Sequence, residues 1–122
     1  MNPVVYFEIP VLDLDRACDF YSKVFQTTLT KDIVDGYQMA FFDSSAESFG
    51  ASGALVVGDV YVPSQQGCFL YFGVESIDET LARAIEHGGS VLYPKKSNGD
   101  LGSVAEIQDS EGNRIALHEE KK

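Results

Sequence analysis

The stretch FEIPVLDLDRA, residues 7–17, decides the fold of this chain. In an extended strand, alternate side chains point to opposite faces. Glu8 would therefore lie on one face, and the opposite face would be apolar and carry Phe7, Ile9 and Val11. Asp13 provides a side-chain oxygen that can cap a helix, and Asp15 places negative charge in the first turn. We therefore predict a strand over residues 4–11 that leads directly into a helix.

The remaining segments predict the same order of elements in both halves of the chain. After the first helix, apolar runs separated by turn residues predict three strands, near residues 27–34, 37–42 and 53–57. In the second half, a strand over residues 69–74 precedes a helix that begins with the capping box Ser76 and Glu79 and ends at Gly88-Gly89. Three more strands follow, near residues 90–93, 103–108 and 113–118. Each half is thus predicted to consist of a strand, a helix and three strands.

A short repeat supports this duplication. Val11-Leu12-Asp13-Leu14-Asp15 and Val74-Glu75-Ser76-Ile77-Asp78 share the pattern apolar residue, any residue, helix cap, apolar residue, Asp, at an offset of 63 residues (74 − 11). Matching elements at matching spacing indicate an internal repeat. A chain of 122 residues is too short for two independent domains. We therefore predict one domain over residues 1–122, with module one at about 1–62 and module two at about 63–122.

Composition limits the partners that this chain can have. Its 19 acidic and 9 basic residues give a formal net charge of −10, which would repel a nucleic acid backbone. No apolar run reaches the roughly 20 residues that a membrane-spanning helix needs, and the first residues lack the basic region of a signal peptide. Cys18 lies on the apolar face of the first predicted helix and Cys68 opens a predicted strand, so both are expected to be buried thiols. Without CxxC spacing they give no zinc or redox motif. We expect a cytoplasmic protein that contacts neither nucleic acid nor membrane.

Two motifs resemble those of a known family. The first combines residues 7–17 with Phe20-Tyr21-Ser22-Lys23-Val24-Phe25, and the second is Asp109-Ser110-Glu111-Gly112-Asn113-Arg114-Ile115. Together they resemble the opening and closing signatures of the vicinal oxygen chelate superfamily, which includes glyoxalases, bleomycin resistance proteins and dioxygenases. The resemblance implies an α+β fold in which two tandem βαβββ modules form a curved mixed-sheet cup with helices on the convex side. It also implies a homodimer.

The positions at which metal-dependent members of this family place their ligands carry unsuitable side chains here. Those members place His or Glu on the first and the last strand of each module. The resemblance transfers these positions to Tyr6, Phe69, Ala54 and Ala116. A divalent metal needs nitrogen, carboxylate or thiolate ligands, which this set does not supply. We expect no metal or other cofactor, and a divalent metal held in an atypical way is the disfavoured alternative.

Strand alternation predicts what lines the cup instead. The predicted lining consists of Tyr6, Glu8, Ala54, Phe69, Tyr71, Ala116 and His118. The opposite face, which would pack against the helices, carries Phe7, Ile9, Leu70, Phe72, Ile115 and Leu117. Glu8 and His118 are the candidate catalytic groups, because a carboxylate and an imidazole can both move protons. The other five lining residues are candidate ligand contacts. Alternatively, Glu8 is solvated at the mouth of the cup and His118 lies at the exposed end of the last strand.

Three functions remain open on the sequence. The first is a metal-free protein that binds or sequesters a small organic molecule, as bleomycin resistance proteins do. The second is an enzyme, such as a lyase, an isomerase or a dioxygenase-like protein, with an atypical metal or a metal-free acid–base site. The third is a non-catalytic interaction module. The aromatic character of the predicted cup favours the first function, without identifying the ligand.

Overall fold

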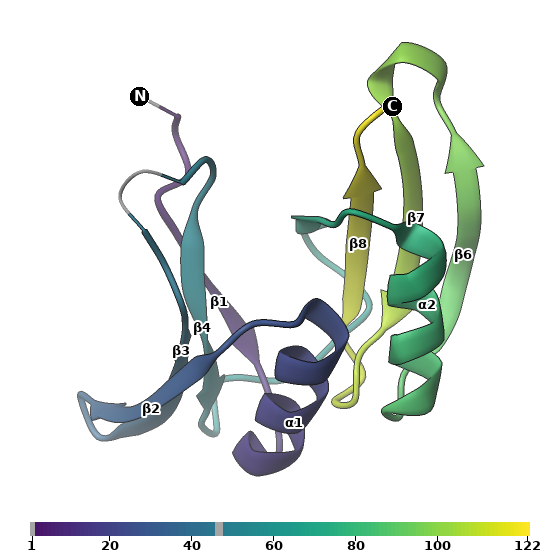
Figure 1. Ribbon diagram of the computed structural model, residues 1–122. Helices are drawn as coiled ribbons and strands as arrows, with labels where there is room; N and C mark the ends of the chain where they lie inside the picture. The colour runs from purple at the N-terminus through teal and green to yellow at the C-terminus, as the bar shows by residue number, and fades with distance from the viewer. Residues whose placement is uncertain (1, 46–47) are drawn as a thin grey trace.

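The computed structural model describes residues 2–45 and 48–122, and it consists of two modules with the same order of elements (Figure 1). The first module contains β1 (Tyr6–Pro10), α1 (Leu14–Phe25), β2 (Leu29–Val34), β3 (Tyr37–Phe42) and β4 (Ser52–Val57). The second contains β5 (Tyr71–Gly73), α2 (Ile77–Glu86), β6 (Ser90–Ser97), a short 3₁₀ helix (Gly99–Leu101), β7 (Ser103–Gln108) and β8 (Arg114–Glu119). The predicted α+β fold with tandem βαβββ modules is confirmed. No helix among the described residues is long and apolar enough to cross a membrane.

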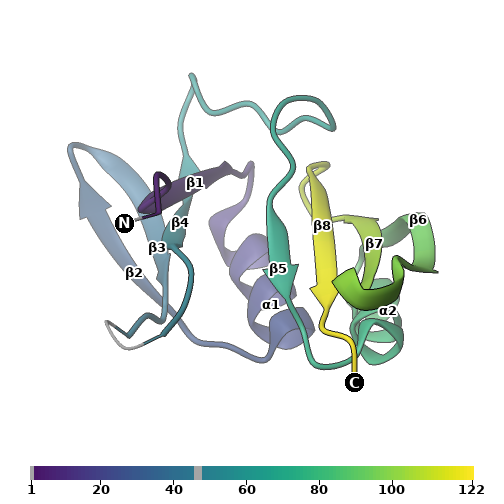
Figure 2. The ribbon, with the colours of Figure 1, turned by 90° about the horizontal axis from the view of Figure 1, so that it is seen from above.

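Each module forms its own four-stranded mixed sheet. The strand orders are β1-β4-β3-β2 and β5-β8-β7-β6. In both sheets the first strand of the module runs parallel to the last one, and the other neighbours are antiparallel. A parallel pair requires a long connection, which the helix and the two intervening strands provide. The outermost strands, β2 and β6, lie at opposite ends of the molecule (Figure 2).

One hydrophobic core joins the two modules. α1 packs against β3, β4 and α2, while α2 packs against β6, β7 and β8 (Figures 1 and 2). The core therefore contains buried residues from both helices and both sheets, among them Tyr21, Leu55, Ile77 and Leu117. Because the helix-covered faces of both sheets meet in this core, the opposite faces point away from it. We call these two uncovered sheet surfaces the open faces.

A cluster of aromatic rings lies where the modules meet. Phe72 of β5 contacts four rings of the first module, and its centroid lies 4.4 Å from that of Phe25. The other three rings belong to Phe7, Tyr21 and Phe42. Aromatic pairs in such tilted or edge-on arrangements add stabilisation beyond the area that they bury. The cluster thus ties the short strand β5 to α1 and to the first sheet.

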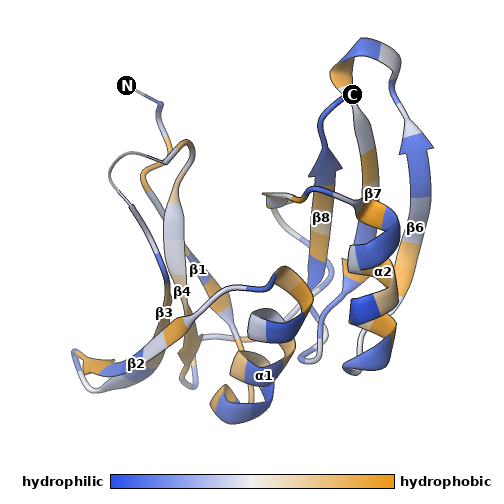
Figure 3. Cartoon of the chain, viewed as in Figure 1, coloured by the Kyte–Doolittle hydropathy of each residue, from blue (hydrophilic) through white to orange (hydrophobic). Residues whose placement is uncertain are grey.

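The strands and helix starts follow the sequence pattern. The six residues predicted to face the helices either lie in the core or pack against it, namely Phe7, Ile9, Leu70, Phe72, Ile115 and Leu117. Figure 3 shows the alternation as bands of contrasting hydropathy along β8. Asp13 accepts the backbone N–H of Arg16 at 3.0 Å, and Ser76 accepts that of Glu79 at 3.2 Å. Both predicted helix caps are therefore confirmed.

The strand predicted over residues 69–74 is shorter than expected. β5 begins only at Tyr71, and the chain before it turns at Gly67, whose φ of +96° lies in the left-handed region. Residues 58–70 therefore form a connection on the surface instead of a strand. Cys68, expected to be buried, is exposed in this connection, and Cys18 is half-buried on α1.

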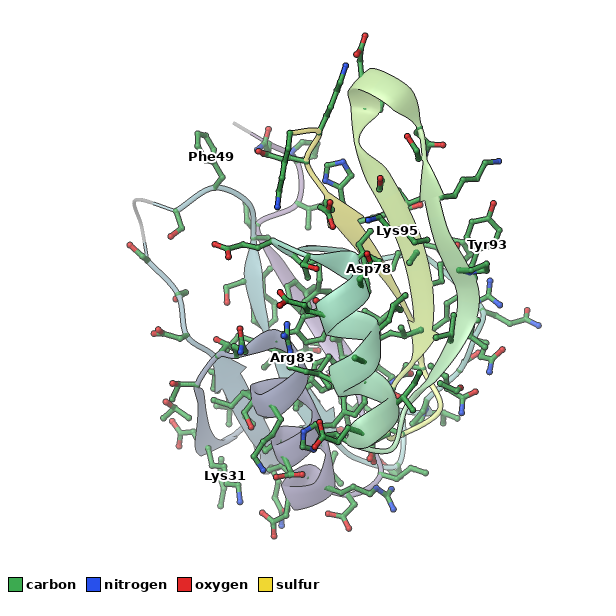
Figure 4. All side chains as sticks on the ribbon, turned by 45° about the vertical axis from the view of Figure 1, so that its right-hand side comes forward. Lys31, Phe49, Asp78, Arg83, Tyr93 and Lys95 are labelled. Atoms are coloured by element: carbon green, nitrogen blue, oxygen red, sulfur yellow. The ribbon has the colours of Figure 1, made fainter. Side chains whose placement is uncertain are left out.

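β6 is longer than predicted. Residues 95–97, expected to lie in a loop, continue the strand as far as Ser97, which pairs with Ser103. Lys95 extends from β6 toward α2 (Figure 4), and its ammonium group lies 3.3 Å from the Asp78 carboxylate. Irregularities in the pairing with β7 interrupt the alternation along β6, which is why the sequence pattern did not predict its second half.

The turn between β7 and β8 connects the second module to the first. Glu111 in this turn has a fully buried side chain that accepts the backbone N–H groups of Leu12 and Asp13, both at 2.8 Å. Arg16 donates to the same carboxylate from Nε at 2.7 Å and from Nη2 at 3.0 Å. Charge-assisted hydrogen bonds of this kind are among the strong ones in proteins. Glu111 thus holds the start of α1 against the second module.

Two more residues of the same turn extend this contact. Asp109 is buried and accepts the hydroxyl of Tyr21 at 2.5 Å. Asn113 donates from Nδ2 to the carbonyl oxygen of Pro10 at 2.7 Å. Asp109 also accepts the backbone N–H groups of Glu111 and Asn113, both at 2.8 Å, which fixes the shape of the turn. We call Asp109, Glu111 and Asn113 the inter-module latch.

We predict that Glu111→Gln lowers the free energy of unfolding by roughly 2–3 kcal/mol, because an amide cannot accept every donor and Arg16 loses its counterion. Urea unfolding followed by circular dichroism measures this loss. Glu120→Gln alters an exposed carboxylate near the C-terminus and should change the free energy by less than about 0.5 kcal/mol. Small and equal losses of unfolding free energy in Glu111→Gln and Glu120→Gln would contradict the role of the inter-module latch.

The latch also predicts a dependence of stability on pH. Burial alone would raise the pKa of Glu111, but the hydrogen bonds from Arg16, Asp13, Ser110 and Leu12 outweigh it and lower the pKa from 4.5 to about 2. A carboxyl group with a lower pKa in the folded state stabilises the fold above its unfolded pKa and loses this contribution as the pH falls. The free energy of unfolding should therefore decrease between pH 4.5 and about pH 2, and less steeply in Glu111→Gln. Parallel pH curves for the two proteins would exclude this explanation.

Candidate functional site

The open face of the first sheet carries a second, smaller apolar cluster. Its buried members are Met39, Ala54 and Val56, and the rings that pack against them are Tyr37, Phe41 and Tyr61. Ala54 lies between Glu8 of β1 and Phe41 of β3 in the sheet register. Because Ala54 is fully buried, this predicted ligand position forms part of the floor beneath the aromatic rings.

Beside this cluster, Glu8 accepts hydrogen bonds from two tyrosine hydroxyls. Tyr6 donates to Oε2 at 3.0 Å, and Tyr61 donates to Oε1 at 2.8 Å. Tyr6 lies two residues before Glu8 on β1, so strand alternation puts both side chains on the open face. The ring of Tyr61, which follows β4, meets the ring of Tyr37 edge to face at a centroid distance of 5.4 Å. We call Tyr6, Glu8, Tyr37 and Tyr61 the tyrosine–glutamate cradle.

Gly58, directly after β4, makes room for two rings of the cradle. A Cβ atom at this position would lie 2.5 Å from Cε1 of Tyr37 and 3.1 Å from Cδ2 of Tyr61. The shorter of these distances is closer than a real side chain allows, so any larger residue would displace the Tyr37 ring. The backbone of Gly58 therefore determines how closely Tyr37 and Tyr61 approach the sheet.

The hydroxyls of Tyr6 and Tyr61 stay protonated at neutral pH. Partial burial, together with the hydrogen bond to Glu8 and its negative charge, raises the pKa of Tyr6 to about 12. For Tyr61, the hydrogen bond to Glu8 is the main cause of a raised pKa, and burial and the charge of Glu8 add to it. Both phenols are therefore donors to a carboxylate and not nucleophiles or bases.

Two clefts border the cradle. The larger, of about 740 Å³, is lined by Tyr6, Phe41 and residues 43–45 and 48–51. The smaller, of about 150 Å³, is lined by Glu8 together with residues of the second module, including Arg114. The cradle is thus open to solvent on two sides.

The open face of the second sheet has a different character. Tyr71, Ala116 and His118 share this face, and Ala116 is fully buried beneath its neighbours. The Arg114 guanidinium lies over the ring of Phe69 at 5.5 Å from the centroid and donates to Glu106 at 2.8 Å. Among the described residues, Arg114 Nε is buried without a hydrogen-bond partner. This face therefore combines exposed aromatic rings with a cation that a carboxylate already neutralises.

The structure does not bring the two candidate catalytic groups together. Glu8 is bound by two tyrosine hydroxyls on the first sheet. The Nε2 atom of His118 lies 2.7 Å from the carbonyl oxygen of Leu101 in the second module. The two residues also line different clefts. An acid–base pair formed by Glu8 and His118 therefore has no geometric basis within one chain.

Sequence reasoning did not single out Tyr37, Tyr61 or Arg114. Strand alternation could have placed Tyr37 on the open face of β3, and Arg114 on the same face as Ala116. Tyr61 carries no such signal, because it lies in a connection without periodicity and its partner Glu8 is 53 residues away in the chain.

The side chains at the family's metal-ligand positions do not fit a divalent metal. Tyr6 and Phe69 are aromatic, and Ala54 and Ala116 have no donor atom and are fully buried. Among residues 2–45 and 48–122, no group of three or more His, Cys, Asp or Glu side chains is arranged to hold a metal ion. No chemical step at a metal is therefore derived for this site.

The sequence matches the family model of the Glyoxalase/Bleomycin resistance protein/Dioxygenase superfamily over residues 4–117. The chain belongs to this superfamily. The match extends over both modules, and it confirms the resemblance suggested by residues 7–17 and 109–115. No curated protein matches the sequence.

Solved structures of this superfamily have the same fold. A glyoxalase/bleomycin resistance protein from Albidiferax ferrireducens has a TM-score of 0.76 at 19% identity, covering 98% of this chain and 100% of its own. TnmS3, an antibiotic binding protein from a Streptomyces strain, has a TM-score of 0.68 at 25% identity, covering 99% and 98%. Glyoxalase I from Zea mays has a TM-score of 0.68 at 19% identity, covering 96% and 46%. This chain therefore spans about half the length of the maize protein.

We predict that the purified protein contains no stoichiometric zinc, nickel, manganese, iron or magnesium, and that adding these ions leaves its unfolding midpoint unchanged. A metal bound only by the folded state would add about 2.7 kcal/mol at a hundredfold excess over its Kd. Elemental analysis and a thermal-shift titration measure both quantities. A raised midpoint with stoichiometric metal would mean that ligands other than the family positions form a metal centre.

Proposed function

We propose that this protein binds a small organic molecule on its open faces, without a metal or other cofactor. The observation that carries the proposal is the exposure of large aromatic rings on these faces: Tyr6 is 44% exposed, Phe69 45% and Tyr71 54%. Aromatic walls with a few polar groups are typical of small-molecule sites. The rings offer apolar area for stacking, and Glu8 and Arg114 offer polar contacts that would orient a ligand.

Binding accounts for these faces better than catalysis does. An acid–base enzyme needs its groups within hydrogen-bond reach of the same reacting centre. Glu8 and His118 lie on different clefts, and the side chains at the family's metal positions have no suitable donors. A binding role is also supported by TnmS3, which is an antibiotic binding protein that matches nearly the whole of this chain.

We also propose that two copies form a homodimer in which the open faces of different copies face each other. Within one chain both open faces point away from the shared core, so neither encloses a ligand. Large apolar side chains on and beside these faces would gain from burial. They include Val5 and Val62, which line the two clefts beside the cradle, and Phe69. The cytoplasm stays the predicted location of this protein.

We predict that the neutral aromatic probe N-phenylnaphthylamine binds the folded protein, and that Tyr6→Ala or Phe69→Ala weakens binding at least about threefold through loss of a stacking ring. Fluorescence titration at neutral pH measures the Kd. Ile85→Ala is the control, because Ile85 is an exposed apolar residue on α2, which packs on the face of the second sheet opposite its open face.

A loss of probe binding in Ile85→Ala equal to that in Tyr6→Ala and Phe69→Ala would contradict binding at the open faces. Absence of probe binding to the folded protein would instead favour an interaction module.

The proposed homodimer can be tested by its mass in solution. Light scattering at micromolar concentration should give twice the chain mass of 13.4 kDa. Phe69→Asp should reduce this mass toward that of a single chain, because it places a charge on an apolar contact surface. A single-chain mass for the unmodified protein would rule out the dimer.

A further inference from the structure

We propose that the tyrosine–glutamate cradle is a site for the cationic group of an organic ligand, such as an ammonium. This inference rests on the proposed function and names the chemical class of the ligand that the first open face would select. It concerns Tyr6, Glu8, Tyr37 and Tyr61, which lie together at the edge of the small apolar cluster.

The cradle combines the two features by which proteins recognise organic cations. A cation is attracted to the face of an aromatic ring, and several rings around one position form the cage that binds quaternary ammonium groups. Here Tyr6 and Tyr61 both donate to a single carboxylate, that of Glu8, and a third ring, Tyr37, packs edge-on against Tyr61. The charge of Glu8 would repel an anionic ligand, and a neutral ligand could gain only a hydrogen bond from it.

Glu8 retains the capacity to bind a cation. Each carboxylate oxygen has more than one acceptor direction, and each oxygen of Glu8 accepts one tyrosine hydroxyl. None of the ion pairs found within residues 2–45 and 48–122 includes Glu8. The nearby cation Arg114, which lines the same small cleft, is paired with Glu106 at 2.8 Å. The negative charge of Glu8 is therefore available to a ligand.

The rings and the carboxylate are already held in position before a ligand binds. The hydroxyls of Tyr6 and Tyr61 fix both oxygens of Glu8, and Gly58 lets Tyr37 and Tyr61 lie close to the sheet. A site that is preorganised in this way loses less conformational entropy on binding. The formal net charge of −10 adds a long-range attraction for cations.

The experiment compares choline with neohexyl alcohol, its neutral isostere in which carbon replaces the quaternary nitrogen. The protein carries carbon-13 in its tyrosine rings, so that its 6 tyrosines report binding individually. Choline should shift the ring signals of Tyr6, Tyr37 and Tyr61 and leave that of Tyr21, which is buried in the core, unchanged. We expect a Kd on the order of tenfold lower for choline than for the alcohol.

Variants test whether the preference for choline over the alcohol comes from the charge of Glu8. Glu8→Gln should weaken choline binding at least about fivefold and leave the alcohol unaffected, because only the cation interacts with the charge. Asp59→Asn is the matched control, since it removes one exposed carboxylate from the same connection as Tyr61 and should change the choline Kd by less than about twofold. Glu8→Gln keeps the acceptor oxygen for one tyrosine, and its circular dichroism and unfolding midpoint show whether the fold persists.

Equal affinities for choline and the alcohol would overturn the inference, as would equal losses in Glu8→Gln and Asp59→Asn. Choline shifts confined to Tyr71 and Tyr93 would overturn it too, because they would place the cation on the second open face. In each of these cases, binding of N-phenylnaphthylamine at the open faces would leave the proposed function standing. If N-phenylnaphthylamine does not bind the folded protein, the proposed function itself is contradicted.

Discussion

The arrangement of the two modules depends on the buried carboxylate of Glu111. A carboxylate that loses its hydration must be compensated by hydrogen bonds. Glu111 obtains one from Ser110 beside it and the others from Leu12, Asp13 and Arg16 of the other module. The same turn contributes Asp109 and Asn113, which bind Tyr21 and Pro10. Glu111 of the second module thus accepts the backbone N–H groups just before α1 of the first module. Neither module could form these hydrogen bonds alone.

This contact determines which surfaces stay free. With α1 held against the second module, the helix-covered faces of both sheets share one core, and Phe72 joins the rings of the first module. The open faces must then point outward, with their aromatic rings exposed to solvent. The proposed ligand site on these outward faces would form either on one sheet or between two copies. The chemistry of the two faces differs, because one presents a carboxylate that two tyrosine hydroxyls bind, and the other an arginine that is paired with Glu106.

Local patterns in the sequence were sufficient for most of the fold. Alternation in β1 and β8 assigned Ile9 and Leu117 to the core, and the caps Asp13 and Ser76 marked both helix starts. The sequence signal failed where the structure depends on distant partners. Residues 69 and 70 were predicted to open a strand, yet they end the surface connection over residues 58–70, in which Gly67 turns the chain before β5 begins at Tyr71.

The candidate site was predicted only in part, because its contacts join residues that are far apart in the sequence. Glu8 and Tyr6 were identified from one strand, but their connection to Tyr61 spans 53 residues and is fixed by the packing around Gly58.

The central claim is that aromatic rings on the open faces are accessible to small molecules. Relaxation of carbon-13 tyrosine ring signals by a dissolved neutral nitroxide tests it most directly. Strong relaxation of Tyr6 and Tyr71, with Tyr21 unaffected, is the predicted result, whereas protection of Tyr6 and Tyr71 equal to that of Tyr21 would contradict the account.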